Sequence, residues 1–498
     1  MRSHPSTPAE RVPWVGHLLA HAGEYGAVAE LSRACGASRQ TLYAWRGRGR
    51  EAVEAAFAPP PPAAPGPPLA RCVLTLLVEG HASYRGIQDC LRELLGREVG
   101  LGTVAGIVAE AGGRARALLS ESAPAAPVAL ALDELFGHAP QAAYLSAVDA
   151  RSGAVWAAAG PVGADADSWT LVLWDLAARG VRCTAAVHDG GKAAAGGCAA
   201  AAPGTPRQRD LWHVLHRAAQ VQARLDRRVT EAEARWASAE RHAAAVAAGQ
   251  RPRARPPLPA AEAVGRVAAA ERAAADLRYL TEAVGRLLGV VVVERGRVLD
   301  LATRRAELAA ALTLLAELAA TAPPAAQAEL RGLRRHLDEA LPGLLSFAAA
   351  LDPVQRDLAG VLGSDGVGLV AWAWERRAVL GTGEVLLAQL PPPWRAAARV
   401  LLAAWDGAVR ASSAVEAWHS LLRPHLAVHR TLSPGLLALL AVRHNHRVYA
   451  RGAHAGRSPL HLSGLPDAPT DWLTALGYPP TAPAAPATPL TPEVRLAA

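Results

Sequence analysis

The alternation of short apolar runs with turn residues predicts a β-sheet in the second quarter of the chain. Four runs have the length and composition of strands. They cover residues 128–132, 144–148, 155–159 and 182–187. A stretch with helical spacing, residues 165–179, separates the third run from the fourth. The predicted order is therefore strand, strand, strand, helix, strand.

Helical spacing near the start of the chain predicts a helix-turn-helix. Residues 24–48 form two short apolar faces broken at Gly36, and Ser38 is placed to cap the second helix. Leu42 and Trp45 would pack back on the first helix. The second helix turns outward side chains that suit phosphates and base edges. These candidate DNA-binding residues are Arg39, Gln40, Thr41, Tyr43 and Arg46. An ordinary helical hairpin is the alternative.

Composition sets the boundaries of the segments on either side of the predicted sheet and helical insertion. Residues 1–57 hold the first module, and the Pro-rich residues 58–68 read as a semi-rigid linker. A second helical module, residues 69–120, would serve packing or dimerisation or would read DNA. The tail, residues 466–498, is rich in Pro, Ala and Thr near its end and is expected to be flexible.

A long helical interval follows the strands. Apolar residues recur with helical spacing over residues 211–248, 260–288, 301–320 and 324–340. Two shorter runs, residues 290–293 and 297–299, allow a small hairpin. The interval predicts an inserted helical domain over residues 205–400. It would cover an active site or grip DNA, or it would act only as a brace.

Composition and charge restrict the class of protein. The chain has 498 residues and a net charge of +8, with an isoelectric point near 9.7, which suits a polyanionic partner without proving one. Abundant alanine accounts for much of the apolar content, and no apolar stretch is long enough to span a bilayer. Five scattered cysteines without a CxxC pair favour a reducing compartment. We therefore expect a cytoplasmic protein with no membrane partner.

Three acidic positions carry the candidate chemistry. Asp133 ends the first strand run, Asp189 ends the fourth, and Glu416 opens a later helix. Each has a plainer explanation, because the aspartates could cap turns and Glu416 could form a capping box with Ser413. Glu134 is an alternative to Asp133, although strand alternation sends the two to opposite faces. Three clustered carboxylates would repel one another unless a divalent cation lay between them, and oxygen ligands suit Mg²⁺ or Mn²⁺.

The segment after Glu416 is basic. No acidic residue occurs from residue 417 to residue 466. His419 and Arg423 follow Glu416 on the same predicted helical face, and Arg430 lies beyond them. We expect these three side chains to contact DNA phosphates, with a solvated basic face as the alternative.

The order of Asp133, Asp189 and Glu416 behind a DNA-binding-like segment resembles the DDE transposases of bacterial insertion sequences. Residues 410–416 are similar to the Asn-(Ser/Asn)-x-x-Glu segment that carries the third carboxylate in many of them, except that Ser412 stands where Asn is frequent. Residues 209–215 resemble the Asp-x-(aromatic)-His segment that follows the second catalytic Asp. Residues 456–460 resemble the Ser-Pro-Leu ending.

The resemblance implies a multidomain α+α/β protein. Its RNase H-like (retroviral-integrase) catalytic core would lie in residues 121–204 and 401–465, interrupted by an all-α insertion. Two metals held by the triad would support hydrolysis at transposon ends and strand transfer to target DNA. His213 would orient a scissile phosphate or water, or pack in the core. Double-stranded DNA, as terminal inverted repeats and target, and a second copy of the chain would be partners. A decayed or domesticated protein that binds DNA without cutting it is the alternative.

Overall fold

The computed structural model describes residues 7–57, 68–138, 142–251, 258–377 and 384–480. The described residues divide into two compact units, one within residues 7–57 and the other within residues 68–480. Apart from Pro68, the predicted linker lies outside the described residues, as does the last part of the predicted tail.

The first unit contains three described helices: α1 (Pro8–Ala20), α2 (Ala27–Cys35) and α3 (Arg39–Phe57). The turn between α2 and α3 begins at Gly36, whose φ of 74° is left-handed. Ser38 accepts a hydrogen bond from the backbone N–H of Thr41, as predicted. Leu42 and Trp45 are buried in a small core with Leu31, which confirms their predicted packing. Helix α1 completes this core and was not predicted.

A five-stranded mixed sheet forms the centre of the second unit. Its strands are β1 (Val128–Phe136), β2 (Ala143–Asp149), β3 (Val155–Val162), β4 (Cys183–His188) and β5 (Arg207–Arg209). Their order in the sheet is β3-β2-β1-β4-β5, with β2 antiparallel to both neighbours and β1, β4 and β5 parallel. The predicted succession of three strands, a helix and a strand is confirmed, and the helix is α7 (Ala166–Ala178).

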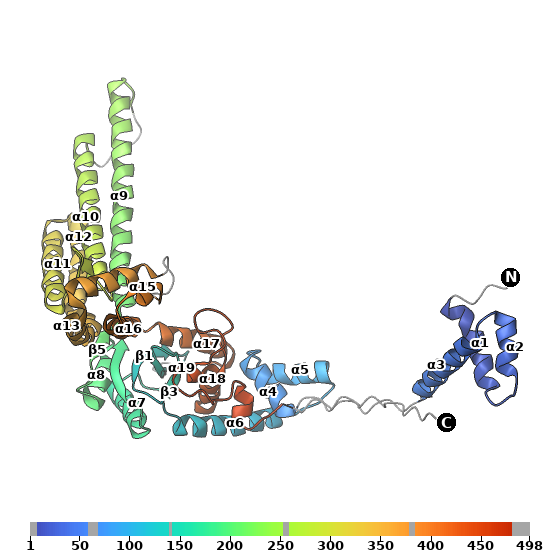
Figure 1. Ribbon diagram of the computed structural model, residues 1–498. Helices are drawn as coiled ribbons and strands as arrows, with labels where there is room; N and C mark the ends of the chain where they lie inside the picture. The colour runs from blue at the N-terminus through green and yellow to red at the C-terminus, as the bar shows by residue number, and fades with distance from the viewer. Residues whose placement is uncertain (1–6, 58–67, 139–141, 252–257, 378–383, 481–498) are drawn as a thin grey trace. The chain divides into compact units, whose positions relative to one another are not determined.

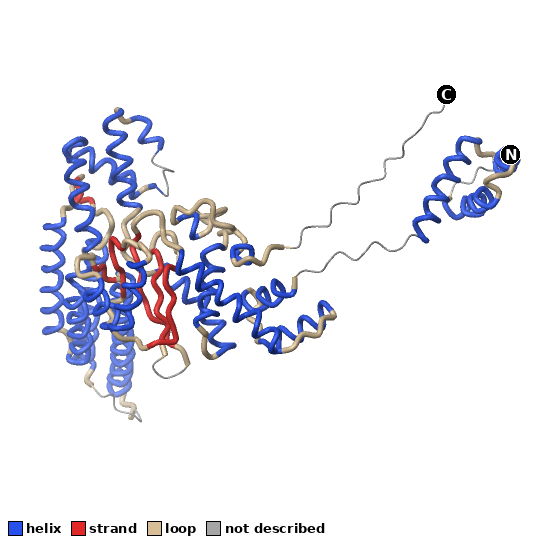
Figure 2. Tube along the Cα trace, turned by 90° about the horizontal axis from the view of Figure 1, so that it is seen from below, coloured by secondary structure: helices blue, strands red, loops and turns tan. Residues whose placement is uncertain are grey.

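Helices cover both faces of this sheet (Figure 2). On one face, Leu130 and Leu132 pack with residues of α7 and α8 (Lys192–Ala201). On the other face, Ala131 packs with residues of α17 (Ser413–His429) and α18 (Pro434–His446). Neighbouring residues of β1 therefore belong to different cores, as strand alternation requires.

The helices before the sheet share a core with the helices that end the unit. Helices α4 (Leu69–Val78), α5 (Tyr84–Leu95) and α6 (Leu101–Glu121) contribute to the same buried cluster as α17 and α18. A Cβ on Gly112 of α6 would lie 2.8 Å from the Cα of Gly435 in α18, so glycine permits this close approach. Residues 69–120 are thus packed on the sheet domain.

The prediction of a flexible tail from residue 466 is wrong for residues 466–480. After the short helix α19 (Pro459–Leu462), helix α20 (Trp472–Ala475) buries Trp472 and Leu473 in the core shared with α4 to α6. Asp471 also pairs with Arg71 of α4 at 2.9 Å. The prediction failed because the proline-rich composition at the end of the segment was applied to the whole of it, including the apolar residues Trp472 and Leu473.

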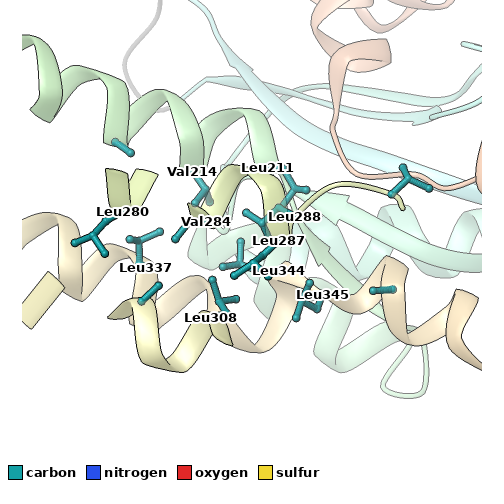
Figure 3. Close-up of a cluster of buried hydrophobic side chains, with 14 of the residues drawn as sticks. Leu211, Val214, Leu280, Val284, Leu287, Leu288, Leu308, Leu337, Leu344 and Leu345 are labelled. Atoms are coloured by element: carbon teal, nitrogen blue, oxygen red, sulfur yellow. The ribbon is translucent and has the colours of Figure 1, made fainter. Parts of the chain in front are cut away.

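A helical domain is inserted between β5 and α17 (Figure 1). Its helices are α9 (Leu211–Ala247), α10 (Ala260–Leu287), α11 (Leu301–Thr321), α12 (Pro324–Leu344), α13 (Ser346–Glu375), α15 (Glu384–Gln389) and α16 (Pro392–Asp406). Leucine and valine side chains from α9, α10, α11 and α12 form its core (Figure 3). The domain is not purely helical, because β6 (Val293–Glu294) and β7 (Arg297–Val298) form the hairpin that the sequence allowed. It also begins later than residue 205, because β5 belongs to the main sheet.

The protein is therefore a mixed helical and sheet protein of more than one unit, as expected. Among the described helices, none combines the length and apolar character needed to cross a membrane.

Candidate metal centre

Asp189 directly follows β4, as predicted, but Asp133 lies inside β1, which continues to Phe136, and not at its end. Strands β1 and β4 run parallel, with Ala131 opposite Val187. Continuing that register by two residues brings Asp133 beside Asp189. Asp189 is exposed, and its Oδ1 accepts a 2.7 Å hydrogen bond from the backbone N–H of Gly191.

Helix α17 brings Glu416 to Asp133. One carboxylate oxygen of each residue and one ring nitrogen of His419 lie within 4.8 Å of one another. Glu416 and Asp133 are partly exposed, so a hydrated ion has access to them. The group offers two carboxylates and an imidazole, and the carboxylate of Asp189 lies just beyond the adjacent strand. Donors of these kinds suit a divalent cation. Among the described residues, this is the group of acidic, His and Cys side chains close enough to hold a metal.

The capping-box explanation for Glu416 is wrong. The N-cap of α17 is Ser412, and Ser413 is already the first helical residue. The helix has no side-chain cap of its own at this end. Glu416 instead makes a 3.2 Å ion pair with Arg423, and both side chains remain substantially exposed. Its carboxylate therefore remains accessible at the edge of the site.

Glu134 lies on the other face of β1, as strand alternation predicted. Its carboxylate accepts a hydrogen bond from the indole N–H of Trp169 in α7. Burial raises the pKa of Glu134, the Trp169 hydrogen bond lowers it, and the charges of Asp133 and Asp189 raise it further. This carboxylate is thus near the candidate ligands but already has a partner of its own.

His419 does not present itself to a DNA surface as the sequence suggested. Its side chain is only 1% exposed and lies between α17 and β2. The Nδ1 atom lies 3.4 Å from Oδ2 of Asp133, and Nε2 lies 3.2 Å from Oγ of Ser146. His419 does lie on the same face of the helix as Glu416, as predicted. The sheet covers that face at His419, however, so this side chain is buried. The expected contact of His419 with DNA phosphates is therefore replaced by a contact with Asp133.

Hydrogen bonding around Ser146 indicates which nitrogen of His419 carries the proton. The indole N–H of Trp418 donates to Ser146 Oγ at 3.0 Å, and an indole can only donate. The hydroxyl hydrogen of this fully buried serine is then available to His419 Nε2. With Nε2 as the acceptor, Nδ1 carries the hydrogen of the neutral ring, on the side that faces Asp133. In this tautomer His419 would orient Asp133, and its Nδ1 would not also bind a metal.

Asp210 holds the start of α17 in place. This residue is 2% exposed and caps α9 by accepting hydrogen bonds from the backbone N–H groups of Trp212 and His213. Its other oxygen accepts from both the backbone N–H and the hydroxyl of Ser412. Leu211 N–H also donates to the carbonyl of Arg410 at 3.0 Å. Both carboxylate oxygens of Asp210 are therefore already hydrogen-bonded.

His213 does not join the Asp133 group. It lies in the first turn of α9, partly buried, with its ring edge-on to Trp212 at 4.9 Å. The position is compatible with either of its predicted roles.

The remaining candidate DNA-binding residues are mostly exposed. On α3, Arg39, Gln40 and Tyr43 are exposed, whereas Thr41 and Arg46 are partly buried. The Arg46 guanidinium lies 5.0 Å from the ring centre of Tyr43. In the second unit, Arg423 and Arg430 are exposed. These side chains can reach a ligand from solvent.

Sequence reasoning missed two features of the site. Ser146, on a strand distant in sequence, contacts His419 and accepts a hydrogen bond from Trp418, and nothing in the local pattern of Ser146 signals this. Asp210 had a signal, because an Asp directly before a helical run is a common N-cap. Its second bond, to Ser412, depends on the fold.

Comparison with known proteins identifies no family for this chain: no protein-family model matches it, and no curated protein matches it.

Proposed function

We propose that this protein is a DDE-type DNA transposase. The observation that carries the proposal is the meeting of three elements at one end of the sheet. Asp133 in β1 lies beside Asp189, which follows the parallel strand β4, and α17 brings a carboxylate oxygen of Glu416 within 4.8 Å of one of Asp133. A carboxylate cluster of this kind is suited to binding divalent metals that act on phosphodiesters.

The sheet supports assigning the second unit to the RNase H-like fold. Three antiparallel strands, a helix and a fourth strand that returns beside the first are the arrangement this fold requires. The helical domain between β5 and α17 would be an insertion into that core. In the first unit, α2 and α3 would be a helix-turn-helix whose second helix enters the major groove.

Asp133, Asp189 and Glu416 would hold Mg²⁺ or Mn²⁺. Such ions activate a water or a 3′-hydroxyl and stabilise the leaving oxygen of a phosphodiester. Within the chain, His419 orients the Asp133 carboxylate, and Asp210 fixes the start of the helix that carries Glu416. Arg423 neutralises Glu416 and is exposed, so it can turn toward a DNA phosphate. The expected reactions are hydrolysis at transposon ends and strand transfer to target DNA by paired copies of the chain.

A cleavage and strand-transfer assay tests the proposal. The substrate is DNA that carries the inverted repeats flanking the protein's own coding sequence, with Mg²⁺ or Mn²⁺. Asp133→Asn, Asp189→Asn and Glu416→Gln should each lower the cleavage rate about a thousandfold or more, because each removes a charged ligand. Asp167→Asn, at an exposed position of α7, is the matched control. An active triad variant would exclude that residue from the metal centre.

One observation favours a second function, DNA binding without cleavage. Without a metal, Glu416 is already paired with Arg423, and Asp133 already contacts His419. These partners reduce the repulsion that would otherwise require an ion. Under this alternative the wild-type protein binds the repeats but cuts them with neither metal.

A further inference from the structure

Arg209 ends the edge strand β5 beside the turn that carries Asp189. It pairs with His188 across the β4–β5 ladder, and the next residue, Asp210, donates its N–H to the His188 carbonyl. The guanidinium lies directly over Gly190, whose φ is +94°. A Cβ built on Gly190 would fall 0.8 Å from Nη1 of Arg209. Because glycine has no side chain, Gly190 leaves room for the guanidinium of Arg209 to pack against the turn that carries Asp189.

Among the described residues, the guanidinium of Arg209 makes no side-chain hydrogen bond. Arg209 Nε is buried and has no hydrogen-bond partner within the described part of the chain. Burial lowers the pKa of Arg209, while the charges of Asp189, Glu339 and Asp210 raise it. No carboxylate forms an ion pair with Arg209 among the residues that the structure covers. A partly desolvated cation with an unused buried donor is suited to a ligand that completes the site.

A second unused donor lies nearby on α12. His336 Nε2 is also buried without a partner among the described residues. Burial lowers the pKa of His336, and the charges of Arg209 and Arg217 lower it further, so positive groups from β5 and α9 face the ring. Glu339 opposes this effect and His213 adds to it. The acids near Arg209 are Asp189, Glu339 and Asp210, and the last of these is occupied by Ser412 and α9.

We propose that Arg209 and His336 form a phosphate-binding site beside Asp189, with Arg217 adding positive charge. The planar fork of a guanidinium binds two oxygens of a phosphate at once, and an imidazole N–H can bind a third. The ligand would be a phosphodiester of the DNA strand that is cut. Naming DNA as its source rests on the proposed function, whereas the site itself would also take inorganic phosphate. The competing explanation is that Arg209 only supports the Gly190 turn.

Inorganic phosphate is the probe that tests the site without cleavage. Its binding to the full-length chain is followed by ³¹P line broadening in the presence of a metal chelator. Arg209→Met should weaken phosphate binding about tenfold or more, because a charge-assisted bidentate contact is lost. Arg209→Lys should weaken it less, since it keeps the charge and loses the fork. Arg207→Met removes an exposed arginine from the same strand and should leave binding unchanged.

Unchanged phosphate binding in Arg209→Met, or no phosphate binding by the wild-type protein, would overturn the proposal. If Arg209→Met fails to fold, Arg209→Lys and His336→Gln decide instead, and wild-type binding in both would be equally decisive against it. The DNA assay is separate. A protein that binds phosphate through Arg209 but cuts no DNA with Mg²⁺ or Mn²⁺ would refute the transposase and leave the phosphate site standing.

Discussion

Asp210 and Ser412 are joined by two hydrogen bonds to one carboxylate oxygen, from the backbone N–H at 2.8 Å and from the hydroxyl. Asp210 caps the first helix of the inserted domain, and Ser412 precedes the helix that carries Glu416. The two ends of the insertion are therefore hydrogen-bonded together at the start of the helix that carries Glu416. This contact couples the position of Glu416 to the base of α9.

Replacing Asp210 with Asn should loosen that contact. An amide offers one accepting oxygen, so either the α9 cap or the Ser412 bonds must be lost. We expect a loss of about 1–3 kcal/mol in the free energy of unfolding, because buried N–H groups are left unpaired. Urea denaturation measures this loss. Asp467→Asn, at an exposed position of the same unit, is the control. Equal stability of both variants would show that Asp210 contributes nothing beyond its charge.

Replacing His419 with Gln should weaken metal binding even though the triad stays intact. Loss of a group that orients a ligand typically lowers metal affinity about 10- to 100-fold. Electron paramagnetic resonance of free Mn²⁺ measures the affinity directly and requires no DNA cleavage. Ser146→Ala, which removes the partner of His419 Nε2, should produce a smaller loss in the same direction. His454→Gln, at an exposed histidine, should have no effect. Wild-type affinity in His419→Gln would exclude the positioning role.

Buried histidines should make the second unit sensitive to acid. Burial lowers the pKa of His425 from 6.5 to about 4, helped by the charges of His81, His429 and Arg443. The unfolded chain therefore takes up a proton that the folded protein resists. This contribution to stability is complete above pH 6.5 and is lost as the pH falls toward 4. His425→Leu should flatten the dependence of the melting temperature on pH across that window.

His188 and His444 have pKa values lowered to about 4 by burial as well, so His425→Leu should remove only part of the slope. His454→Leu, at an exposed position, should leave the slope unchanged. A slope as steep in His425→Leu as in the wild-type protein would contradict the assignment.

The sequence predicted what depends on local pattern. The β1 run is apolar at successive positions because both of its faces are covered, and it ends at polar residues where that cover ends. The start of helix α3 was recognised from its spacing and its Ser38 cap, which the structure confirms. Helix α1 was not predicted because Pro8 and Pro13 suggest a break in helical structure. In the structure Pro8 stands in the first turn of the helix, where proline is tolerated.

Long-range contacts were beyond the sequence. Helical spacing predicts that His419 and Glu416 share one face of their helix. It does not predict that Ser146 and Asp133 of the sheet pack against His419. The unpaired guanidinium of Arg209 depends on the meeting of β5 with the Gly190 turn and α12. The parallel pairing of β1 with β4, which brings Asp133 beside Asp189, likewise joins strands that are distant in the sequence.

DNA binding by the first unit should depend on which arginine of α3 is removed. Arg39 is exposed at the start of the helix, whereas Arg50 already pairs with Glu54 one turn on, at 3.5 Å. An arginine that binds a phosphate releases a counterion. Arg39→Ala should therefore weaken binding and lower the slope of the logarithm of affinity against the logarithm of salt concentration by the amount expected for about one phosphate contact. Arg50→Ala should have a smaller effect, because Glu54 offsets its charge. Fluorescence anisotropy with the inverted-repeat DNA at several salt concentrations measures both. Equal losses in the two variants would show that α3 attracts DNA by its overall charge and has no defined contact at Arg39.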